Sequence, residues 1–334
     1  MEYRSLGRTG VKVSPLCLGC MMFGAKTELD DSCAIIDRAL DAGINFLDTS
    51  NSYSRGRSEE FVGTALKRNG KRHRVVLATK VRSQMADDDP NMVGNHRRHI
   101  IDQCDASLRR LQTDYIDLYQ IHRPQSDIPI DETLRALDDL VRAGKVRYIG
   151  TSTFAAWQLV ESLWAAKEYG LNRFVCEQPP YNLLDRRIER ELLPMTQTYG
   201  FGVIPWSPLG GGLLTGKYQR DVPATAGRYA NKEAAWLQRR LTPRMYEVVA
   251  GLQPLAAAKN CTLGQLALAW CLQQPGVTSP IIGPRTLEHF EESLGALAIQ
   301  LAGADRKRID EIAPPGTMAA PFYESDFGPH LHRW

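Results

Sequence analysis

The sequence lacks the long apolar runs and the one-sided charge that mark several protein classes. No apolar stretch approaches the roughly 18 residues that a membrane-spanning helix needs. The 41 Lys and Arg residues nearly balance the 38 Asp and Glu residues, which leaves a net charge of +3 and no strong field for nucleic acid or acidic membranes. The N-terminal segment resembles neither a secretion signal nor a transit peptide. We therefore expect a cytoplasmic protein that binds neither nucleic acid nor a membrane.

Cysteine is also scarce, and its pattern does not suggest a disulfide scaffold. Seven cysteines are spread thinly over 334 residues, which favours reduced thiols. Cys17 and Cys20 form a C-x-x-C motif, but no second such motif and no histidine pair follow at zinc-finger spacing. His96 and His99 lack a third ligand nearby in the sequence, so we expect them on a solvated helix face. No metal site is predicted.

A regular alternation of two kinds of segment fills most of the chain. Short apolar runs alternate with segments in which apolar residues recur every three or four positions, as on one face of a helix. The strand-like runs are residues 15–19, 44–49, 75–80, 115–122, 146–152, 174–178, 202–207 and 279–283. The helical segments are residues 31–43, 58–70, 97–112, 131–144, 155–170, 186–200 and 263–276. This order predicts parallel strands joined by helices, hence an α/β protein with a (β/α)8 TIM barrel; a doubly wound sheet is the alternative.

Three segments stand apart from this alternation. The "GRTG" stretch near the N-terminus predicts a β-hairpin. Residues 208–245 form a long, Gly-rich, basic loop after the seventh strand; a connection of this length is usually a lid, a binding loop or disordered. Residues 313–334 form a C-terminal tail rich in proline and aromatic residues. Because no internal repeat, low-complexity tract or linker is found, we predict one domain over residues 1–334.

Polar residues occur where several of the predicted strands end. Asp48, Lys80 and His122 end the second, third and fourth strands, and Tyr53 lies in the loop after Asp48. Active sites of such barrels lie at the C-terminal ends of the strands. Each residue also has a structural alternative: the acid can cap a helix, the lysine can extend to solvent and the histidine can be a core residue.

Together the four residue types form a chemically sensible acid catalyst. A free tyrosine loses its proton near pH 10, and a neighbouring ammonium makes it a better proton donor by stabilising the phenolate. Lys80 can supply this charge, and Asp48 can keep a buried lysine protonated. His122 can orient a carbonyl oxygen between its ring and the phenol. General acid catalysis of this kind contributes about 10²- to 10⁴-fold in rate.

Several longer motifs carry a resemblance to a known family. They are "GINFLDTSNSYSRGRSEEFVGTAL", "VVLATK", "SLRRLQTDYIDLYQIHRP", "LVRAGKVRYIGTSTF", "IPWSPLGGGLLTGKY" and "IIGPRTLEHFEESLGAL". With them the chain resembles the aldo-keto reductase superfamily, in particular bacterial members close to the potassium-channel β-subunit type. The resemblance implies the barrel fold and a catalytic tetrad of Asp48, Tyr53, Lys80 and His122. It also implies NADPH-dependent reduction of an aldehyde or ketone to an alcohol, with the proton coming from Tyr53.

The cofactor residues are likewise implied by the resemblance. No G-x-G-x-x-G follows the first strand, so a Rossmann site is not indicated. Ser152 and Gln178 would hold the nicotinamide carboxamide, and Trp206 would lie near its ring. Contacts to the pyrophosphate would come from Ser207, Pro208, Leu209, Gly210 and Lys217; independently, a Gly-rich loop lets backbone amides approach phosphate closely.

The adenosine end would contact Gly283, Arg285, His289, Glu292 and Ser293. A guanidinium can bind the 2′-phosphate with two hydrogen bonds, so Arg285 favours NADPH over NADH. The chain departs from the common family pattern at three positions. Thr153 and Ser293 stand where asparagine is usual, and His289 stands where glutamine is usual. The departures at 289 and 293 leave the adenine contacts and the cofactor preference open.

Two other functions compete with a general carbonyl reductase. The potassium-channel β-subunits resemble this family closely and act mainly as cofactor-bound partners of a membrane protein. Parts of the middle of the chain resemble bacterial keto-sugar or deoxysugar reductases. The expected partner is a small carbonyl substrate, and a homo-oligomer is left open. Met22 and Phe23 are candidate substrate contacts, and the aromatic tail is either a wall of the pocket or surface packing.

Overall fold

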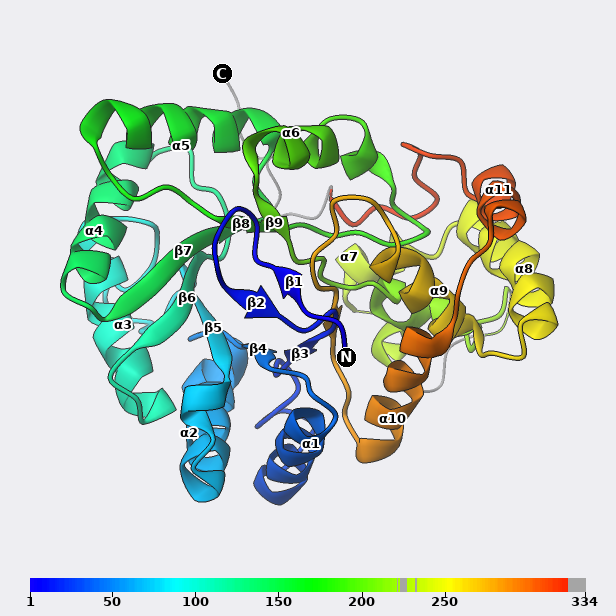
Figure 1. The fold of residues 1–334 in the computed structure, drawn as a ribbon, viewed down its shortest axis with the longest axis horizontal. Coiled ribbons are helices and arrows are strands. Elements are labelled where there is room, and N and C mark those ends of the chain that lie inside the picture. Colours follow the sequence, from blue (N-terminus) through cyan, green and yellow to red (C-terminus); the bar gives the residue numbers. More distant parts are fainter. Residues whose placement is uncertain (221, 223–226, 232, 324–334) are drawn as a thin grey trace.

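The centre of the molecule is a closed parallel β-barrel (Figure 1). The computed structural model describes residues 1–334 except 221, 223–226, 232 and 324–334. Eight strands form one sheet in the order β10-β3-β4-β5-β6-β7-β8-β9, and every neighbouring pair is parallel. Backbone hydrogen bonds of 2.8 Å, from the Ile281 amide to the Pro205 carbonyl and from the Thr278 amide to the Val203 carbonyl, join the two ends of this order. The predicted (β/α)8 barrel is thereby confirmed, and the doubly wound sheet is excluded.

The strands and helices follow one another as the alternation predicts. The barrel strands are β3 (Cys17–Gly19), β4 (Phe46–Asp48), β5 (Val76–Val81), β6 (Ile116–Ile121), β7 (Val146–Ser152), β8 (Cys176–Gln178), β9 (Gly202–Val203) and β10 (Ile281–Ile282). The predicted helices correspond to α1 (Leu29–Asp41), α2 (Arg57–Asn69), α3 (Arg97–Leu111), α4 (Ile130–Arg142), α5 (Ala156–Tyr169), α6 (Leu192–Tyr199) and α9 (Leu263–Leu272). They surround the sheet because each buries one apolar face; α4, for example, buries Leu134, Leu137 and Leu140.

The predicted N-terminal hairpin caps one end of the barrel. Its strands β1 (Arg4–Ser5) and β2 (Lys12–Val13) pair antiparallel. Leu6 and Val13 pack against side chains that point into the barrel, among them Phe46 and Leu118. The approach is close: a Cβ atom on Gly7 would lie 2.6 Å from the Gly202 amide nitrogen, and the φ of Gly7 is +57°. The hairpin closes the end opposite to the one where Asp48 and Lys80 lie.

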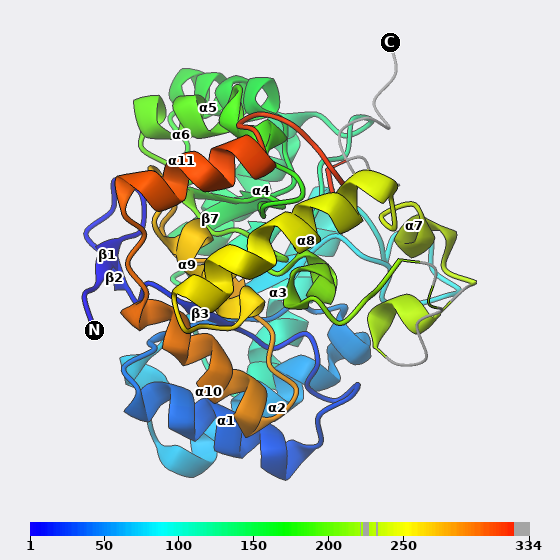
Figure 2. The same cartoon turned by 90° about the vertical axis from the view of Figure 1, so that its right-hand side faces the viewer.

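Four helices were not predicted from the sequence. They are α7 (Ala235–Gln238), α8 (Pro243–Ala258), α10 (Leu287–Gly295) and α11 (Gly303–Ile312), and α8 and α11 pack beside each other (Figure 2). Pro254 lies inside α8 and hides its helical character, although Thr242 caps the helix and Pro243 occupies its first turn. The expected helix over residues 186–200 was too long. It divides into a 3-10 turn at Arg187–Glu189 and α6, because a proline, Pro194, is tolerated only in the first turn of a helix.

The connection after β9 and the tail are largely structured where they are described. The Gly-rich part of the connection forms a 3-10 segment, Gly210–Thr215, and α7 and α8 follow it. In the tail, Phe322 is fully buried and the Tyr323 hydroxyl donates to the Phe154 carbonyl over 2.5 Å. The rest of the predicted aromatic tail, residues 324–334, lies outside the described residues. Among the described helices, none combines the length and hydrophobicity needed to span a membrane.

Candidate active site

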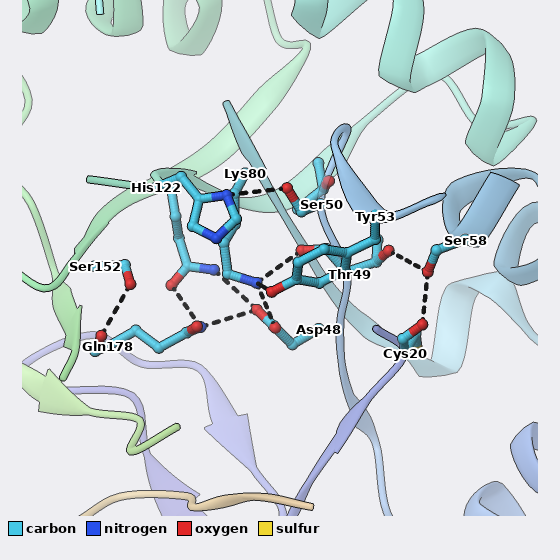
Figure 3. A network of polar contacts seen from close by, with 12 residues as sticks. Cys20, Asp48, Thr49, Ser50, Tyr53, Ser58, Lys80, His122, Ser152 and Gln178 are labelled. Carbon is cyan, nitrogen blue, oxygen red and sulfur yellow. Dashed lines mark hydrogen bonds and ion pairs between the residues drawn. The ribbon is translucent and has the colours of Figure 1, made fainter. Parts of the chain in front are cut away.

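The four predicted catalytic residues meet at the C-terminal end of the barrel (Figure 3). Asp48 is the last residue of β4, Lys80 is the last but one of β5, and His122 directly follows β6. Tyr53 opens a 3-10 turn, Tyr53–Gly56, between β4 and α2. Parallel pairing of β4 with β5 and of β5 with β6 places these strand ends side by side.

The Lys80 ammonium is the centre of the site. Its Nζ atom donates to Asp48 Oδ2 at 2.5 Å, to the Thr49 carbonyl at 2.8 Å and to the Tyr53 hydroxyl at 3.1 Å. All three of its protons therefore have acceptors. The side chain is fully buried, and Nζ also lies 4.8 Å from the centre of the Tyr53 ring.

Lys80 remains charged despite its burial. Burial by itself lowers the pKa of a lysine, but the charge and hydrogen bonds of Asp48 and Tyr53 outweigh it, so the pKa of Lys80 is raised above its ordinary value. The ammonium is consequently protonated at neutral pH. A positive charge next to the phenol is the condition that the proton-donor role of Tyr53 requires.

Two glutamine amides hold Asp48 in place. Gln120 Nε2 donates to Asp48 Oδ1 at 3.1 Å, and Gln178 Nε2 donates to the same oxygen at 2.9 Å. Because Lys80 binds Oδ2, both carboxylate oxygens of this nearly fully buried acid are satisfied. In this arrangement the Gln178 amide faces the tetrad; its contact with a nicotinamide carboxamide remains a prediction.

His122 is a neutral, half-buried ring beside the phenol. Its ring stands edge-on to that of Tyr53, with centroids 5.7 Å apart. Burial lowers the pKa of His122 well below its ordinary value, and the charges of Arg123, Lys80 and Arg82 lower it further. Its Nδ1 atom lies 3.2 Å from the Ser50 hydroxyl. A neutral imidazole whose Nδ1 accepts from Ser50 keeps a proton on Nε2 for donation to a substrate oxygen.

A buried ion pair supports the turn that carries Tyr53. Glu59 of α2 is fully buried, accepts from Thr79 Oγ1 at 2.6 Å and pairs with Arg110 Nε at 2.6 Å. The Arg110 side chain lies directly under Gly56, where a Cβ atom would be 2.7 Å from its Cδ. Gly56 has a φ of +96°, so a larger residue would both collide and strain the turn.

The predicted nicotinamide residues lie next to the tetrad around β7, β8 and β9. The Ser152 hydroxyl donates to the Gln178 carbonyl at 3.0 Å and accepts from Arg123 at 3.1 Å. The half-buried Trp206 donates from Nε1 to Thr153 Oγ1 at 3.3 Å. Thr153 has a φ of +62°, a conformation that asparagine adopts more readily than threonine. The backbone at this position therefore suits the asparagine that is usual in the family better than the threonine found here.

The segment predicted to hold the pyrophosphate combines positive backbone φ values with a nearby lysine. Ser207 has a φ of +53°, and Gly210, Gly211 and Gly212 all have positive φ values. Glycine tolerates this region. The amides of Gly210 and Gly212 donate within the turn, to the Ser207 and Leu209 carbonyls, both at 2.9 Å. The exposed Lys217 side chain reaches back to within 3.5 Å of the Cβ position of Gly212. Lys217 places a positive charge beside this turn, and the contacts of the segment with a pyrophosphate stay predictions.

The predicted adenosine contacts lie on and before α10. Gly283 faces open space, since a Cβ atom there would meet nothing within 4 Å, and the Arg285 carbonyl accepts from Thr27 Oγ1 at 3.0 Å. His289 and Glu292 are exposed. The Ser293 hydroxyl donates to the His289 carbonyl within the helix at 2.8 Å, and Glu292 accepts from Thr262 at 2.9 Å. The structure groups these five positions, and their contacts with a nucleotide stay predictions.

Sequence comparison decides the family. The model of the Aldo/keto reductase family matches residues 15–314, most of the chain. The chain belongs to the aldo/keto reductase family.

Its relatives within the family have different names. The chain is 41% identical over 325 residues to "Uncharacterized oxidoreductase YrpG" of Bacillus subtilis (strain 168), covering 95% of this chain and 97% of that protein. It is 37% identical over 303 residues to a probable voltage-gated potassium channel subunit beta of Arabidopsis thaliana, covering 90% and 92%. A putative voltage-gated potassium channel subunit beta of Schizosaccharomyces pombe is 37% identical over 323 residues, covering 93% of each chain.

Several residues of this reductase-family site were missed from the sequence. Gln120 was accessible to prediction, because it lies two positions before His122 and strand residues two apart share a face. Arg123 donates to Ser152, to Thr153 and to the His122 carbonyl, contacts that no local pattern signals. Ser50 gave no signal either, because its contact with His122 spans 72 positions.

The remaining predictions concern substrate contacts, thiols and histidines. Phe23 is fully buried in the core, so of the predicted substrate pair only Met22 has exposed surface; both roles remain predictions. All seven cysteines are free thiols, and no metal-binding cluster occurs among the residues described.

The prediction of a solvated His99 was wrong. His99 is fully buried, because it occupies the inward face of α3, and its pKa is lowered to about 4.

Proposed function

We propose that this protein is an oxidoreductase that reduces an aldehyde or ketone to an alcohol with NADPH. One observation carries the proposal: a protonated Lys80 joins Asp48 to the Tyr53 hydroxyl while a neutral His122 lies beside the phenol. The name of the Bacillus subtilis relative supports an oxidoreductase.

The four side chains divide the work of protonating a carbonyl oxygen. When bound, the nicotinamide supplies a hydride to the carbonyl carbon. Tyr53 donates its hydroxyl proton to the oxygen, and Lys80 stabilises the phenolate left behind. His122 donates a hydrogen bond from Nε2 to the same oxygen and thereby orients the substrate. Asp48 keeps Lys80 charged and in position without reaching the substrate.

The cofactor is proposed to lie across the mouth from β7 to β10. Ser152, Gln178 and Trp206 would hold the nicotinamide, and Ser207, Pro208, Leu209, Gly210 and Lys217 the pyrophosphate. Gly283, Arg285, His289, Glu292 and Ser293 would hold the adenosine end. The Lys217 ammonium beside Gly212 and the open space at Gly283 support this track. Arg285 supports NADPH over NADH, since a guanidinium pairs well with a 2′-phosphate.

The test is the oxidation of NADPH, followed at 340 nm, with 4-nitrobenzaldehyde and a panel of other carbonyl compounds. We expect turnover by the wild type and a loss of about 10²- to 10⁴-fold in kcat for Tyr53→Phe. NADPH affinity, measured by fluorescence titration, should be nearly unchanged in the variant. A large loss of NADPH affinity in Tyr53→Phe would instead make the tyrosine a binding or structural residue and contradict the proposed role.

A second candidate is a cofactor-bound regulatory subunit of a potassium channel. It is favoured by the names of the relatives from Arabidopsis thaliana and Schizosaccharomyces pombe. The two candidates differ in a simple measurement. Tight NADPH binding without turnover of any carbonyl compound in the panel would favour the regulatory subunit, whereas turnover without an added partner favours the enzyme. A narrow keto-sugar or deoxysugar reductase would show turnover with those substrates alone.

A further inference from the structure

Arg82 is a cation at the mouth of the barrel that the tetrad does not use. It directly follows β5, whose last residue, Val81, pairs with Ile121 of β6. The His122 amide donates to the Val81 carbonyl at 2.9 Å, so Arg82 and His122 are the next residues of two neighbouring strands. Arg82 is close enough for its charge to act on the His122 ring, whose pKa it helps to lower.

The backbone of Arg82 is strained. Its φ of +149° lies in a region that is almost restricted to glycine. Such strain is found mainly at binding and catalytic sites, where the surrounding structure enforces it. Here the Gly94 amide donates to the Arg82 carbonyl at 2.7 Å and ties the end of the following loop to this point. Glycine would meet the backbone requirement more easily, so the reason for an arginine must lie in its side chain.

The side chain has no partner that explains it. Its Nε atom is buried and without a hydrogen bond, and no hydrogen bond or ion pair of its guanidinium occurs in the described part of the chain. The nearby carboxylates Asp87 and Asp89 face other arginines, Arg55 and Arg98. Asp127 acts on Arg82 only through its charge, and burial still lowers the pKa of Arg82 below its ordinary value. A half-buried guanidinium without a counter-ion is costly, so this side chain is suited to pair with an anion that the described protein residues do not supply.

The missing anion does not belong to the proposed cofactor track. That track uses residues that end β7 and β8 or follow β9 and β10, and β5 lies four positions from β9 and three from β10 around the eight-stranded ring. The positions proposed for the pyrophosphate and the adenosine therefore lie on the other side of the mouth. What remains on the side of Arg82 is the space next to His122 and Tyr53, where a substrate must place its carbonyl group.

We propose that Arg82 binds an oxyanion of the substrate, so that the preferred substrate is an aldehyde or ketone that also carries a carboxylate or phosphate group. A guanidinium can hold either group with two parallel hydrogen bonds. This inference rests on the proposed reductase function and adds the substrate class. It also identifies Arg82 as a specificity-determining residue distinct from the tetrad.

The experiment compares matched substrates in wild type and in Arg82→Gly. We use 4-carboxybenzaldehyde against methyl 4-formylbenzoate, succinic semialdehyde against butanal, and glyceraldehyde 3-phosphate against glyceraldehyde. The wild type should prefer the anionic member of at least one pair, and the pair tells carboxylate from phosphate. Arg82→Gly should lower kcat/KM about 10- to 100-fold for that anionic substrate and less than about 2-fold for its neutral partner. The glycine suits the backbone, so the variant should fold, which a thermal melt checks.

Two further variants and one binding measurement make the result decisive. Arg82→Lys should keep part of the preference, and Arg98→Gln, which removes the same charge from the outer helix α3, should leave it unchanged. Equal losses for anionic and neutral substrates in Arg82→Gly, or no preference in the wild type, would overturn the inference while the reductase proposal stands. If no carbonyl compound is reduced at all, the reductase proposal fails. The affinity of the NADPH-loaded protein for terephthalate then tests the role of Arg82. Weaker binding by Arg82→Gly than by the wild type supports an oxyanion site, and equal binding refutes it.

Discussion

At the scale of a single residue, the contact of Ser50 with His122 bears on which ring nitrogen carries the proton. His122 is neutral, so only one of its ring nitrogens carries a proton. Ser50 Oγ lies 3.2 Å from Nδ1 and 3.1 Å from Ser52 Oγ. A hydroxyl that donates to Nδ1 selects the tautomer with the proton on Nε2, which is the one that can donate to a carbonyl oxygen. We therefore expect Ser50 to be a positioning residue that acts through His122.

Ser50→Ala tests this role. Without the hydroxyl, the Nδ1-protonated tautomer is no longer disfavoured, and we expect kcat to fall about 10-fold, the loss of roughly one hydrogen bond, with NADPH affinity unchanged. The ¹⁵N chemical shifts of the His122 ring should move towards those of a tautomer mixture. Ser52→Ala is the control, because it leaves the contact between Ser50 and His122 in place. Unaltered ring shifts in Ser50→Ala would show that another group selects the tautomer.

The helix α3 illustrates what is decided at the scale of an element. Its sequence opens with two histidines and several arginines, which favours a solvated start, yet only one of the two histidines stays near solvent. His96 caps the helix by accepting from the His99 amide, whereas His99 lies one turn in and is fully buried. Residues three positions apart share a face within a helix, but His96 is the extended N-cap that precedes the first turn, so packing on the barrel buries His99 alone.

Burial of His99 makes the stability of the protein depend on pH. Burial, and next the charge of His96, lower its folded-state pKa to about 4, against the opposing effects of the Ser83 backbone and Asp102. The unfolded value is about 6.5, so this contribution is fully present above pH 6.5 and is lost as the pH falls towards 4. The free energy of unfolding, measured with urea, falls between pH 8 and pH 5, and His99→Gln should make this fall about 2 kcal/mol smaller. The exposed His73→Gln should show the wild-type pH dependence; the same dependence in His99→Gln would contradict the assignment.

At the scale of the whole molecule, the C-terminal segment at Phe322 and Tyr323 contacts distant parts of the barrel mouth. The carboxylate of Asp185 accepts from the backbone amides of Phe322 and Tyr323 at 2.8 and 3.1 Å. The Phe322 ring lies 4.0 Å from the Arg240 guanidinium and 6.3 Å from the ring of Trp206. The segment therefore connects the end of the long connection after β9 with the proposed nicotinamide pocket.

Phe322→Ala should weaken both the fold and the pocket. Removal of a fully buried phenylalanine costs about 3–5 kcal/mol, which urea unfolding can measure. Because Trp206 loses a packing neighbour, the Kd for NADPH should also rise, and fluorescence titration below the unfolding temperature can check this. Met318→Ala, at a side chain that is 39% exposed, should change neither quantity appreciably. Normal NADPH affinity in a destabilised Phe322→Ala would restrict the segment to a purely structural role.

The sequence by itself determined the barrel and the end of it at which the four polar residues lie, because both depend on local patterns. Alternating apolar runs specify strands and helices, and a polar residue at the end of a parallel strand necessarily lies at the active end of the barrel, as Asp48 and Lys80 do. Element bounds were less predictable where Pro194 and Pro254 obscured the helical pattern.

Only the tertiary structure decided which distant groups satisfy or fail to satisfy one another. Asp48 is held by amides 72 and 130 positions away, and no local pattern announces such contacts. Whether His99 is buried and whether Arg82 has a partner depend in the same way on what other segments place beside them. The physical reason is that desolvation and pairing act between neighbours in space, whereas periodicity and spacing describe neighbours along the chain.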